Sequence, residues 1–235
     1  MSSWTARRFW TTASAVPVEG GFAVHLDARP VRTPLKAPLV LPTFPLAEAV
    51  AAEWQAQEGK VKPETMPVTR TANSAIDKVA PQHSDVADML AAYGGSDLLC
   101  YRATGPAGLI QVQAEGWDPL LAWAADTLSA PLQVTIGIVP VSQPAESLAA
   151  LSRLVHQLDS FRLAAFHDLV AISGSLVLAL AVIQRRLSAP EAWALSRIDE
   201  DWQISLWGED EEAAEHAALK RAAFLAADRF YGLCG

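Results

Sequence analysis

Two local histidine–carboxylate pairs are the residues of this sequence whose types and spacing could support acid–base chemistry. His167 is followed directly by Asp168, and Glu212 lies one helical turn before His216. An imidazole held by a carboxylate can act as a general base, but catalysis also needs a cleft and correctly placed partner groups. Because such pairs are more often contacts on a helix surface or in a core, they do not by themselves predict an active site.

The usual signatures of nucleotide, nucleophile and metal sites are absent from the sequence. It contains neither G-x-x-x-x-G-K-[ST] nor G-x-G-x-x-G, so no phosphate-binding loop is predicted. The Gly- and Ser-containing segments at 94–97 and 173–175 lack the flanks of a nucleophile elbow. The five histidines form no H-x-x-x-H pair and have no cysteine neighbour, and no D-x-D-x-D-G loop is present. We therefore predict no catalytic residue, no metal and no cofactor.

The acidic stretch from Ile198 to Leu219 points to function most directly. It holds eight carboxylates and no Lys or Arg, whereas the remainder of the chain carries 18 acidic and 18 basic side chains. The net charge of -8 is therefore local, and a local field of one sign concerns binding partners rather than the fold. The eight carboxylates are Asp199, Glu200, Asp201, Glu209, Asp210, Glu211, Glu212 and Glu215.

The helix expected to precede and enter this stretch has two apolar faces. Ser188 or Pro190 can begin it, and the apolar periodicity continues through residues 190–207. One face holds Leu195, Ile198, Trp202 and Leu206, and the opposite face holds Trp193, Glu200, Ile204 and Trp207. A surface helix needs only one apolar face. Either the helix is enclosed in a bundle with both Trp193 and Trp207 in the core, or the second face meets a partner, where tryptophan is favoured.

Length and composition indicate a folded protein of one large or two small domains. The chain has 235 residues, of which 51% are hydrophobic and 19% charged, enough for a real core. The acidic balance argues against nucleic acid and anionic membrane surfaces as partners. Cys100 and Cys234 are far apart and indicate free thiols in a reducing compartment. The apolar segment Leu169 to Ile183 is too short for a membrane span of about 20 residues, so we predict a buried helix and no membrane insertion.

The first part of the chain is expected to be rich in strands. Phe22, Val24 and Leu26 alternate with small or polar residues, as in a half-buried strand. Further strands are predicted at 9–16, 31–33 and 39–41, with turns at Gly20-Gly21 and at 27–30. A helix over 44–58 should follow, begun by Thr43 and buried along Leu46, Val50 and Trp54.

A polar stripe of Arg70, Asn73 and Asp77 runs along the next helical segment, 66–79. Buried polar groups are usually paired, so a hydrogen-bond network that fixes the fold is the preferred interpretation and a ligand site the alternative. Another helix begins at Ser84 or Asp85 and ends near Gly94.

The sequence predicts an α+β protein with a β-rich N-terminal domain over 1–93, containing a few helices, and a mainly helical C-terminal domain over 94–235. In the second domain, strands at 97–103 and 131–137 are expected to pair. Helices are expected at 110–128, 145–158, 160–187, 190–207 and 209–231.

Seven segments spread over nearly the whole chain form a recognisable series. They are R-R-F-W (7–10), L-D-A-R-P-V-R-T-P (26–34), A-E-W-Q-A-Q (52–57), M-P-V-T-R-T-A-N-S-A-I-D (66–77), Y-G-G-S-D-L-L-C-Y-R-A (93–103), W-D-P-L-L-A-W-A (117–124) and D-E-D-W-Q-I-S-L-W-G (199–208). In this order they resemble one protein family, the assembly chaperones of the F-type ATP synthase that act on the alpha subunit of its catalytic head.

The resemblance implies a chaperone that is not an enzyme. Such a protein binds the unassembled alpha subunit, covers the surface that the beta subunit later occupies, and releases its client without hydrolysing ATP. It also implies a bacterial, cytoplasmic member, with eukaryotic relatives in the mitochondrial matrix, and we expect a monomer when free. Acidic residues of the helical region matter for client binding in the family. The client-binding residues assigned here are Glu200, Asp201, Ile204, Trp207, Glu209, Glu211 and Glu212, and the structural residues are Trp54, Arg70, Asn73 and Asp77.

Two alternatives remain open from the residues. A small hydrolase could use His167 with Asp168, or His83 with Asp85, and would need a deep polar cleft around those histidines. A general holdase would instead present a broad apolar surface to many unfolded chains.

Overall fold

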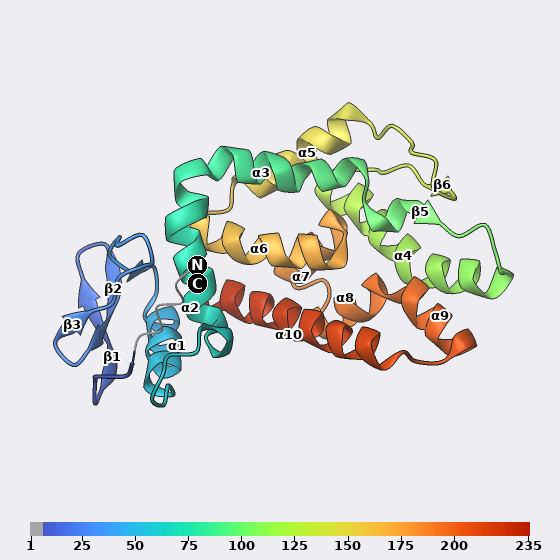
Figure 1. Ribbon diagram of the computed structural model, residues 1–235. Coiled ribbons are helices and arrows are strands. Elements are labelled where there is room, and N and C mark those ends of the chain that lie inside the picture. The colour runs from blue at the N-terminus through green and yellow to red at the C-terminus, as the bar shows by residue number, and fades with distance from the viewer. Residues whose placement is uncertain (1–6) are drawn as a thin grey trace. The chain divides into compact units, whose positions relative to one another are not determined.

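The computed structural model describes residues 7–235, which form two compact units (Figure 1). The first unit comprises residues 7–83, Ser160–Ala165 and Arg229–Gly235, and the second comprises Ser84–Asp159 and Phe166–Asp228. The first holds a small sheet with helices and the second is almost wholly helical, which confirms the predicted α+β class. The boundary expected after residue 93 stays a prediction, because compactness alone does not define an independently folding domain.

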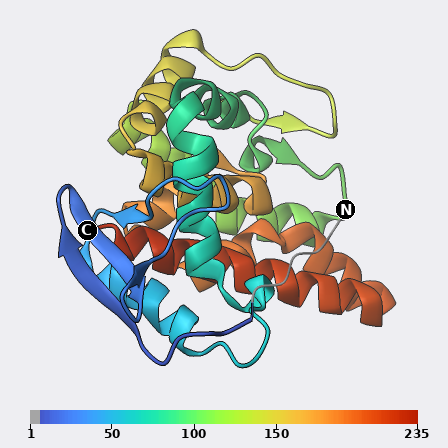
Figure 2. The same ribbon diagram turned by 60° about the vertical axis from the view of Figure 1, so that its left-hand side comes forward.

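The sheet of the first unit is built around one strand, β2 (Figure 2). β2 pairs antiparallel with β1 over its whole length and with β3 and β4 over two residues each. A Cβ at Gly21 would lie 2.3 Å from the carbonyl oxygen of Leu41, so glycine is required for this approach of β4. The return strand predicted at 31–33 lies earlier, at β3, because Asp27 turns the chain at once with a φ of 54°. The strands are β1 (Ala13–Val18), β2 (Gly21–Leu26), β3 (Arg29–Pro30) and β4 (Val40–Leu41).

Helix α1 (Phe44–Gln55) packs on this sheet and supplies much of the core of the first unit. The Thr43 hydroxyl accepts a hydrogen bond from the Leu46 backbone N–H at 3.3 Å, which confirms the predicted helix start. Leu46 and Val50 are fully buried, and the half-buried Trp54 packs edge-on against Trp10 with ring centroids 5.3 Å apart. The inward stripe of α1 is therefore confirmed.

Helix α2 (Pro67–Ser74) follows and continues into a π-helical segment, Ala75–Val79. The start of α2 is capped from α1, since the Glu53 carboxylate accepts hydrogen bonds from the backbone N–H of Val68 at 2.8 Å and of Thr69 at 2.7 Å. Short 3₁₀ turns lie at Pro63–Thr65 and Ala80–Gln82.

The polar stripe on this helical segment does not form the single network that was predicted. Asp77 alone binds a neighbouring segment, accepting from the Thr33 hydroxyl at 2.6 Å and from the Leu35 N–H at 3.1 Å. Arg70 is exposed, and the buried Oδ1 of Asn73 has no hydrogen-bond partner among residues 7–235. The π-helical segment after Ser74 shifts Asp77 relative to the regular helical spacing of Arg70 and Asn73.

The second unit consists of helices with one small parallel ladder. The ladder joins β5 (Tyr101–Arg102) to β6 (Thr135–Ile136), confirming that segments 97–103 and 131–137 pair, although over two residues each. The first of these segments begins as a 3₁₀ turn, Leu98–Cys100, rather than as a strand. The helices are α3 (His83–Ala91), α4 (Ala107–Leu128), α5 (Ala145–His156), α6 (Ser160–Ser173), α7 (Leu176–Ile183), α8 (Ala189–Ser196), α9 (Ile198–Trp207) and α10 (Glu211–Leu233), of which α6 and α10 also contribute residues to the first unit.

The single helix predicted over 160–187 is two helices, broken at Gly174, whose φ is 69°. The fully buried carboxylate of Asp97 fills the break: it accepts from the Ser175 hydroxyl at 2.7 Å and from the N–H groups of Leu99 and Val177, both at 3.0 Å. Burial raises the pKa of Asp97, and these hydrogen bonds act in the opposite direction. Ser175 in turn caps α7. A buried polar cluster thus interrupts the expected helix at Gly174 and Ser175.

The apolar segment Leu169 to Ile183 lies across this break, and most of its side chains are buried, as predicted. Within residues 7–235, no helix is both long enough and apolar enough to cross a membrane.

Candidate functional site

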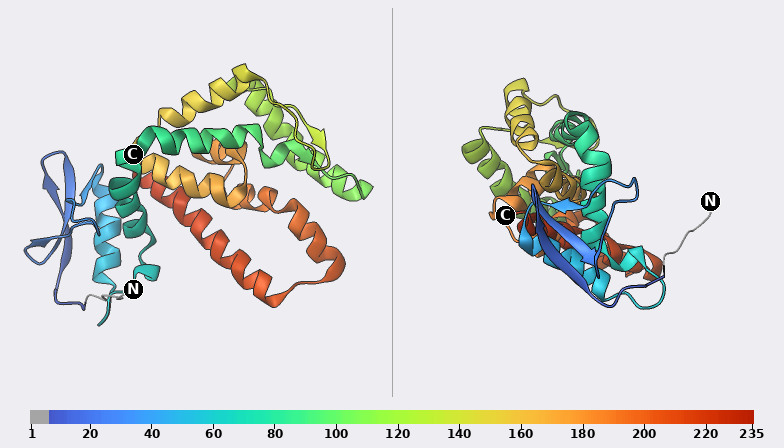
Figure 3. Two further views of the ribbon diagram at one scale, coloured as in Figure 1. Left: turned by 45° about the horizontal axis from the view of Figure 1, so that its top comes forward. Right: turned by 90° about the vertical axis from the view of Figure 1, so that its left-hand side faces the viewer.

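The helix predicted over 190–207 is also two helices, and this break decides which residues are exposed. α8 begins after Ser188, one of the two predicted starts, and the Ser188 hydroxyl and backbone form a capping box with Glu191. It ends at Arg197, where the Ser196 hydroxyl donates to the Trp193 carbonyl at 2.7 Å and the Arg197 N–H donates to Ala194 at 3.1 Å. The chain then restarts as α9 in a new direction (Figure 3).

The two tryptophans of the supposed second face consequently separate. Trp193 on α8 is 8% exposed and packs against Phe224 of α10 with ring centroids 6.1 Å apart. Trp207 at the end of α9 is 82% exposed. The enclosed-helix interpretation is therefore right for Trp193 and wrong for Trp207. On α9 itself, Glu200, Ile204 and Trp207 still share one face at i, i+4 and i+7, and that face is exposed.

The opposite face of α9 is held against α4 by close packing at two glycines. A Cβ at Gly116 would lie 2.9 Å from the Ile198 side chain, and a Cβ at Gly108 would lie 2.7 Å from the ring of Trp202. A side chain at Gly108 would have to displace the Trp202 ring, and one at Gly116 would have to displace the end of the Ile198 side chain. The first apolar stripe, which includes Ile198 and Trp202, is thus confirmed as the inward one, and Leu206 at its end is exposed.

Two hydrogen bonds from α4 hold the end of α8 and the start of α9. The Trp117 indole donates to the carbonyl of Leu195 at 2.9 Å, and the Gln113 amide donates to the Asp199 carboxylate at 2.6 Å. Asp199 is therefore the carboxylate of the acidic stretch that faces the protein. The others project from the opposite side or from the loop and helix that follow.

Among residues 7–235, most carboxylates of the acidic stretch form no ion pair. Asp201 forms an ion pair with Arg197 at 3.3 Å, and Asp210 caps α10 by accepting from the Ala213 N–H at 2.8 Å. Among residues 7–235, the remaining carboxylates form no ion pair and are exposed. These are Glu200, Glu209, Glu211, Glu212 and Glu215. Glu211 and Glu212 lie in the first turn of α10, where the helix dipole favours negative charge.

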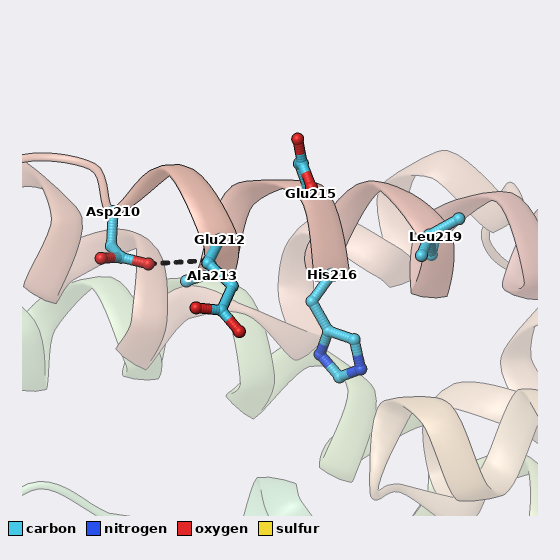
Figure 4. A pocket seen from close by; sticks show the side chains of 6 residues that line it. All are labelled: Asp210, Glu212, Ala213, Glu215, His216 and Leu219. Atoms are coloured by element: carbon cyan, nitrogen blue, oxygen red, sulfur yellow. Dashed lines mark hydrogen bonds between the residues drawn. The ribbon is translucent and has the colours of Figure 1, made fainter.

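An open hollow of about 550 Å³ lies on the first turns of α10 (Figure 4). Glu212 and His216 extend to the same side of the helix, and Leu219, which is largely exposed, closes the far end. The hollow thus combines negative charge with apolar surface. It is lined by Asp210, Glu212, Ala213, Glu215, His216 and Leu219.

We call the exposed residues of α9, of the loop after it and of the first turns of α10 the α9–α10 surface. Its apolar members are Ile204, Leu206, Trp207 and Leu219, and its acidic members are Glu200, Asp201, Glu209, Asp210, Glu211, Glu212 and Glu215. All the residues that the sequence assigned to client binding lie on it. Leu206 and Leu219 were missed because the periodicity placed the first on the inward stripe, and nothing distinguished the second from a core leucine.

Of the histidine–carboxylate pairs noted in the sequence, His167 and Asp168 lie in contact. His167 Nδ1 lies 2.9 Å from Asp168 Oδ1, with both side chains partly exposed, and the hydrogen bond to Asp168 raises the pKa of His167. No hydroxyl or thiol hydrogen-bonds to either residue among residues 7–235. A pair that the sequence did not indicate joins His156 to Asp88 at 2.8 Å, on the surface. Within the same residues, no group of three His, Cys, Asp or Glu side chains is placed to hold a metal ion.

An exposed tryptophan and exposed leucines set among carboxylates are typical of a surface that binds another protein. The comparisons with known proteins show that the chain belongs to a class of chaperones. The family model described as ATP12 chaperone protein matches residues 7–125. The crystal structure of Atp12 from Paracoccus denitrificans is 55% identical in sequence, covers 98% of this chain and 99% of its own, and superposes with a TM-score of 0.95. A variant of the same protein with aspartate replaced by lysine gives 54% identity and the same TM-score.

Two more distant proteins agree with this match. A protein of Agrobacterium tumefaciens is 40% identical, with 98% of this chain and 87% of its own covered and a TM-score of 0.93. The mitochondrial protein atp12 of Schizosaccharomyces pombe is 25% identical over 223 residues, which are 89% of this chain and 76% of the yeast protein. The chain belongs to the ATP12 chaperone family, whose members assist the assembly of ATP synthase.

Proposed function

We propose that this chaperone binds the unassembled alpha subunit of the ATP synthase catalytic head through the α9–α10 surface. In this proposal it covers the alpha surface that the beta subunit later occupies, and the beta subunit displaces it without ATP hydrolysis. The observation that carries the proposal is Trp207, a large aromatic side chain that is 82% exposed in a stretch of the chain rich in exposed carboxylates. A soluble protein gains nothing from such exposure unless a partner covers it.

The energetics of this surface suit a tight but reversible contact. A tryptophan buries roughly 200 Å² when fully covered, which at about 25 cal/mol per Å² gives on the order of 4 kcal/mol. Association and side-chain ordering oppose this gain by a comparable or larger amount, so further contacts are needed. The unpaired carboxylates supply them if the alpha subunit presents Lys or Arg there, and they also speed the encounter.

The proposal includes two further statements. The protein neither binds nor hydrolyses nucleotide, since the sequence has no phosphate-binding loop. It works in the cytoplasm of a bacterium, which fits the bacterial relatives at 54%, 55% and 40% identity. Calorimetry that detects tight ATP binding by the purified protein would contradict the first statement.

The test is a titration of isolated alpha subunit with wild-type protein and with Trp207→Ala. We expect the variant to lose at least 2 kcal/mol of binding, about thirtyfold in Kd, as for a hot-spot residue. Leu35→Ala, at a similarly exposed apolar residue of the first unit, is the matched control and should bind like wild type. An unrelated unfolded chain should not compete. Competition by such chains would instead support a general holdase, and equal affinity of Trp207→Ala and wild type would refute the proposed surface.

A further inference from the structure

The segment between α4 and α5 exposes a second group of apolar side chains, separate from the α9–α10 surface. Ile138 is 92% exposed and Ile136 is 70% exposed, and Val134 and Val139 are exposed as well. All four lie within or next to the short strand β6. Clustered apolar side chains on a protein surface mark sites of interaction.

The backbone of this segment offers an open sheet edge. β6 pairs with β5 in a parallel ladder of two strands, so its other edge has no strand beside it among residues 7–235. The Gly137 N–H donates to the Arg102 carbonyl at 2.8 Å, so the backbone hydrogen-bonding groups at positions 135 and 137 face β5. Because alternate residues of a strand direct their backbone groups to opposite sides, the N–H and C=O of Ile136 point to the free edge. Such an edge can accept an added strand.

The charge of the segment restricts what can occupy that edge. Residues 127–145 contain no Asp, Glu, Lys, Arg or His, although the chain as a whole has a net charge of -8. A charged side chain placed against Ile136 and Ile138 would lose water without gaining a counter-ion. The missing Lys and Arg also remove the attraction that holds an apolar loop on an anionic lipid surface. The occupant that matches this edge is therefore an uncharged, apolar stretch of polypeptide.

We propose that the free edge of β6 binds an extended, apolar and uncharged segment of the client as a third strand. The backbone of Ile136 exchanges hydrogen bonds with that segment, and the side chains of Val134, Ile136 and Ile138 contact its apolar residues. The inference rests on the proposed function in taking the client to be the alpha subunit. It assigns a second contact whose chemistry differs: backbone pairing holds it, so it does not weaken with salt as the acidic contact does.

The experiment compares three variants in titrations with isolated alpha subunit. Ile136→Lys places a charge on the edge. Ile136→Pro removes the backbone N–H that faces the client, and this N–H takes no part in the ladder to β5. Leu35→Lys is the control, because Leu35 is 72% exposed against 70% for Ile136. We expect both Ile136 variants to lose about tenfold or more in affinity and the control to lose none. Thermal melting of each variant checks the fold.

Amide hydrogen exchange supplies a readout that needs no substitution. In the complex of the wild-type protein with alpha subunit, exchange at the Ile136 amide should slow by at least about tenfold, because the N–H then donates to the added strand. If Ile136→Pro melts at a lower temperature than wild type, this protection decides the matter.

Four outcomes overturn the inference, and they are distinguishable. If wild type binds alpha subunit and Ile136→Lys binds equally well with no protection of the amide, the edge is not a client site although the proposed function stands. If wild type does not bind alpha subunit at all, the proposed function fails and the inference falls with it. A wild-type dimer in sedimentation that Ile136→Lys dissociates assigns the edge to a second copy of the chain. Binding to phosphatidylcholine–phosphatidylglycerol vesicles that Ile138→Lys abolishes assigns it to a membrane.

Discussion

Reversing the charge of Glu200 should abolish much of the affinity for the client and leave the fold intact. Glu200 is exposed on α9, forms no ion pair among residues 7–235, and shares its face with Ile204 and Trp207. In a complex it would lose water against these apolar side chains, so a basic residue of the client gains a strong charge-assisted hydrogen bond there. Glu200→Lys would instead bring two cations together in a dry interface.

The expected loss of binding can be set against the expected loss of stability. Like charges in a desolvated interface cost about 2–5 kcal/mol, which is roughly thirtyfold to several thousandfold in Kd. The free protein loses only the favourable position of a carboxylate in the first turn of α9, about 0.3–1 kcal/mol, with Arg197 one turn away adding a small repulsion. For a chain of this size, such a change lowers Tm by about 1–4 °C.

The assay is isothermal titration of isolated alpha subunit, with melting temperature measured on the same samples. Glu48→Lys is the control, because Glu48 is an exposed carboxylate on α1, far in sequence from the α9–α10 surface. Asp199→Lys is unsuitable, since Asp199 accepts the hydrogen bond from Gln113 at 2.6 Å and its loss would disturb the packing of α9 on α4. The reasoning is refuted if Glu200→Lys binds as tightly as Glu48→Lys, or if it melts far below wild type.

Three other predictions follow from the same structure. Trp54→Arg should destabilise the first unit by about 3 kcal/mol, seen as a lower denaturation midpoint, because it removes the ring that packs on Trp10; a variant as stable as wild type that fails to bind client would show that Trp54 acts in recognition. Client affinity should fall as the salt concentration rises, because the α9–α10 surface is acidic. An unchanged Kd would show that this surface faces only solvent in the complex. Asp97→Asn should cost about 1–3 kcal/mol, because an amide cannot accept from all three donors around Asp97. Burial raises the pKa of Asp97 in the folded protein, so its contribution to the free energy of unfolding is full at low pH and is lost as pH rises through that pKa. In urea denaturation, the difference in free energy of unfolding between wild type and Asp97→Asn should therefore be largest at low pH. A difference that grows as pH rises would contradict this prediction.

Much of the local structure could be predicted from the sequence because it depends on nearby residues. Thr43 and Ser188 begin helices where the capping rules place them, and the alternation at Phe22 to Leu26 forms the central strand. The buried stripe of α1 follows from its spacing. These features need only the preferences of adjacent residues and one apolar face.

The two helix breaks could not be predicted in the same way, because the apolar periodicity continues through them. At Gly174 the chain turns to meet Asp97, whose partners Ser175 and Val177 are 78 and 80 residues away in sequence. A single aspartate in a hydrophobic neighbourhood gives no indication of partners at that separation. At Arg197 the break depends on hydrogen bonds of Ser196 and on the packing of α9 against α4, which are known only once both helices are placed.

The break at Arg197 explains how a stretch of sequence with two apolar faces can bury one tryptophan and expose the other. A continuous helix would have kept Trp193 and Trp207 on the same face, and burying one would have buried the other. By ending α8 and restarting at Ile198, the chain leaves Trp193 against Phe224 and turns Trp207 out to solvent. Ile198 and Trp202 pack on α4 at Gly116 and Gly108, where a Cβ would lie 2.9 Å and 2.7 Å from their side chains. Because this face of α9 is held against α4, the opposite face, which carries Trp207, is left exposed, and a larger residue at Gly108 would have to displace the Trp202 ring.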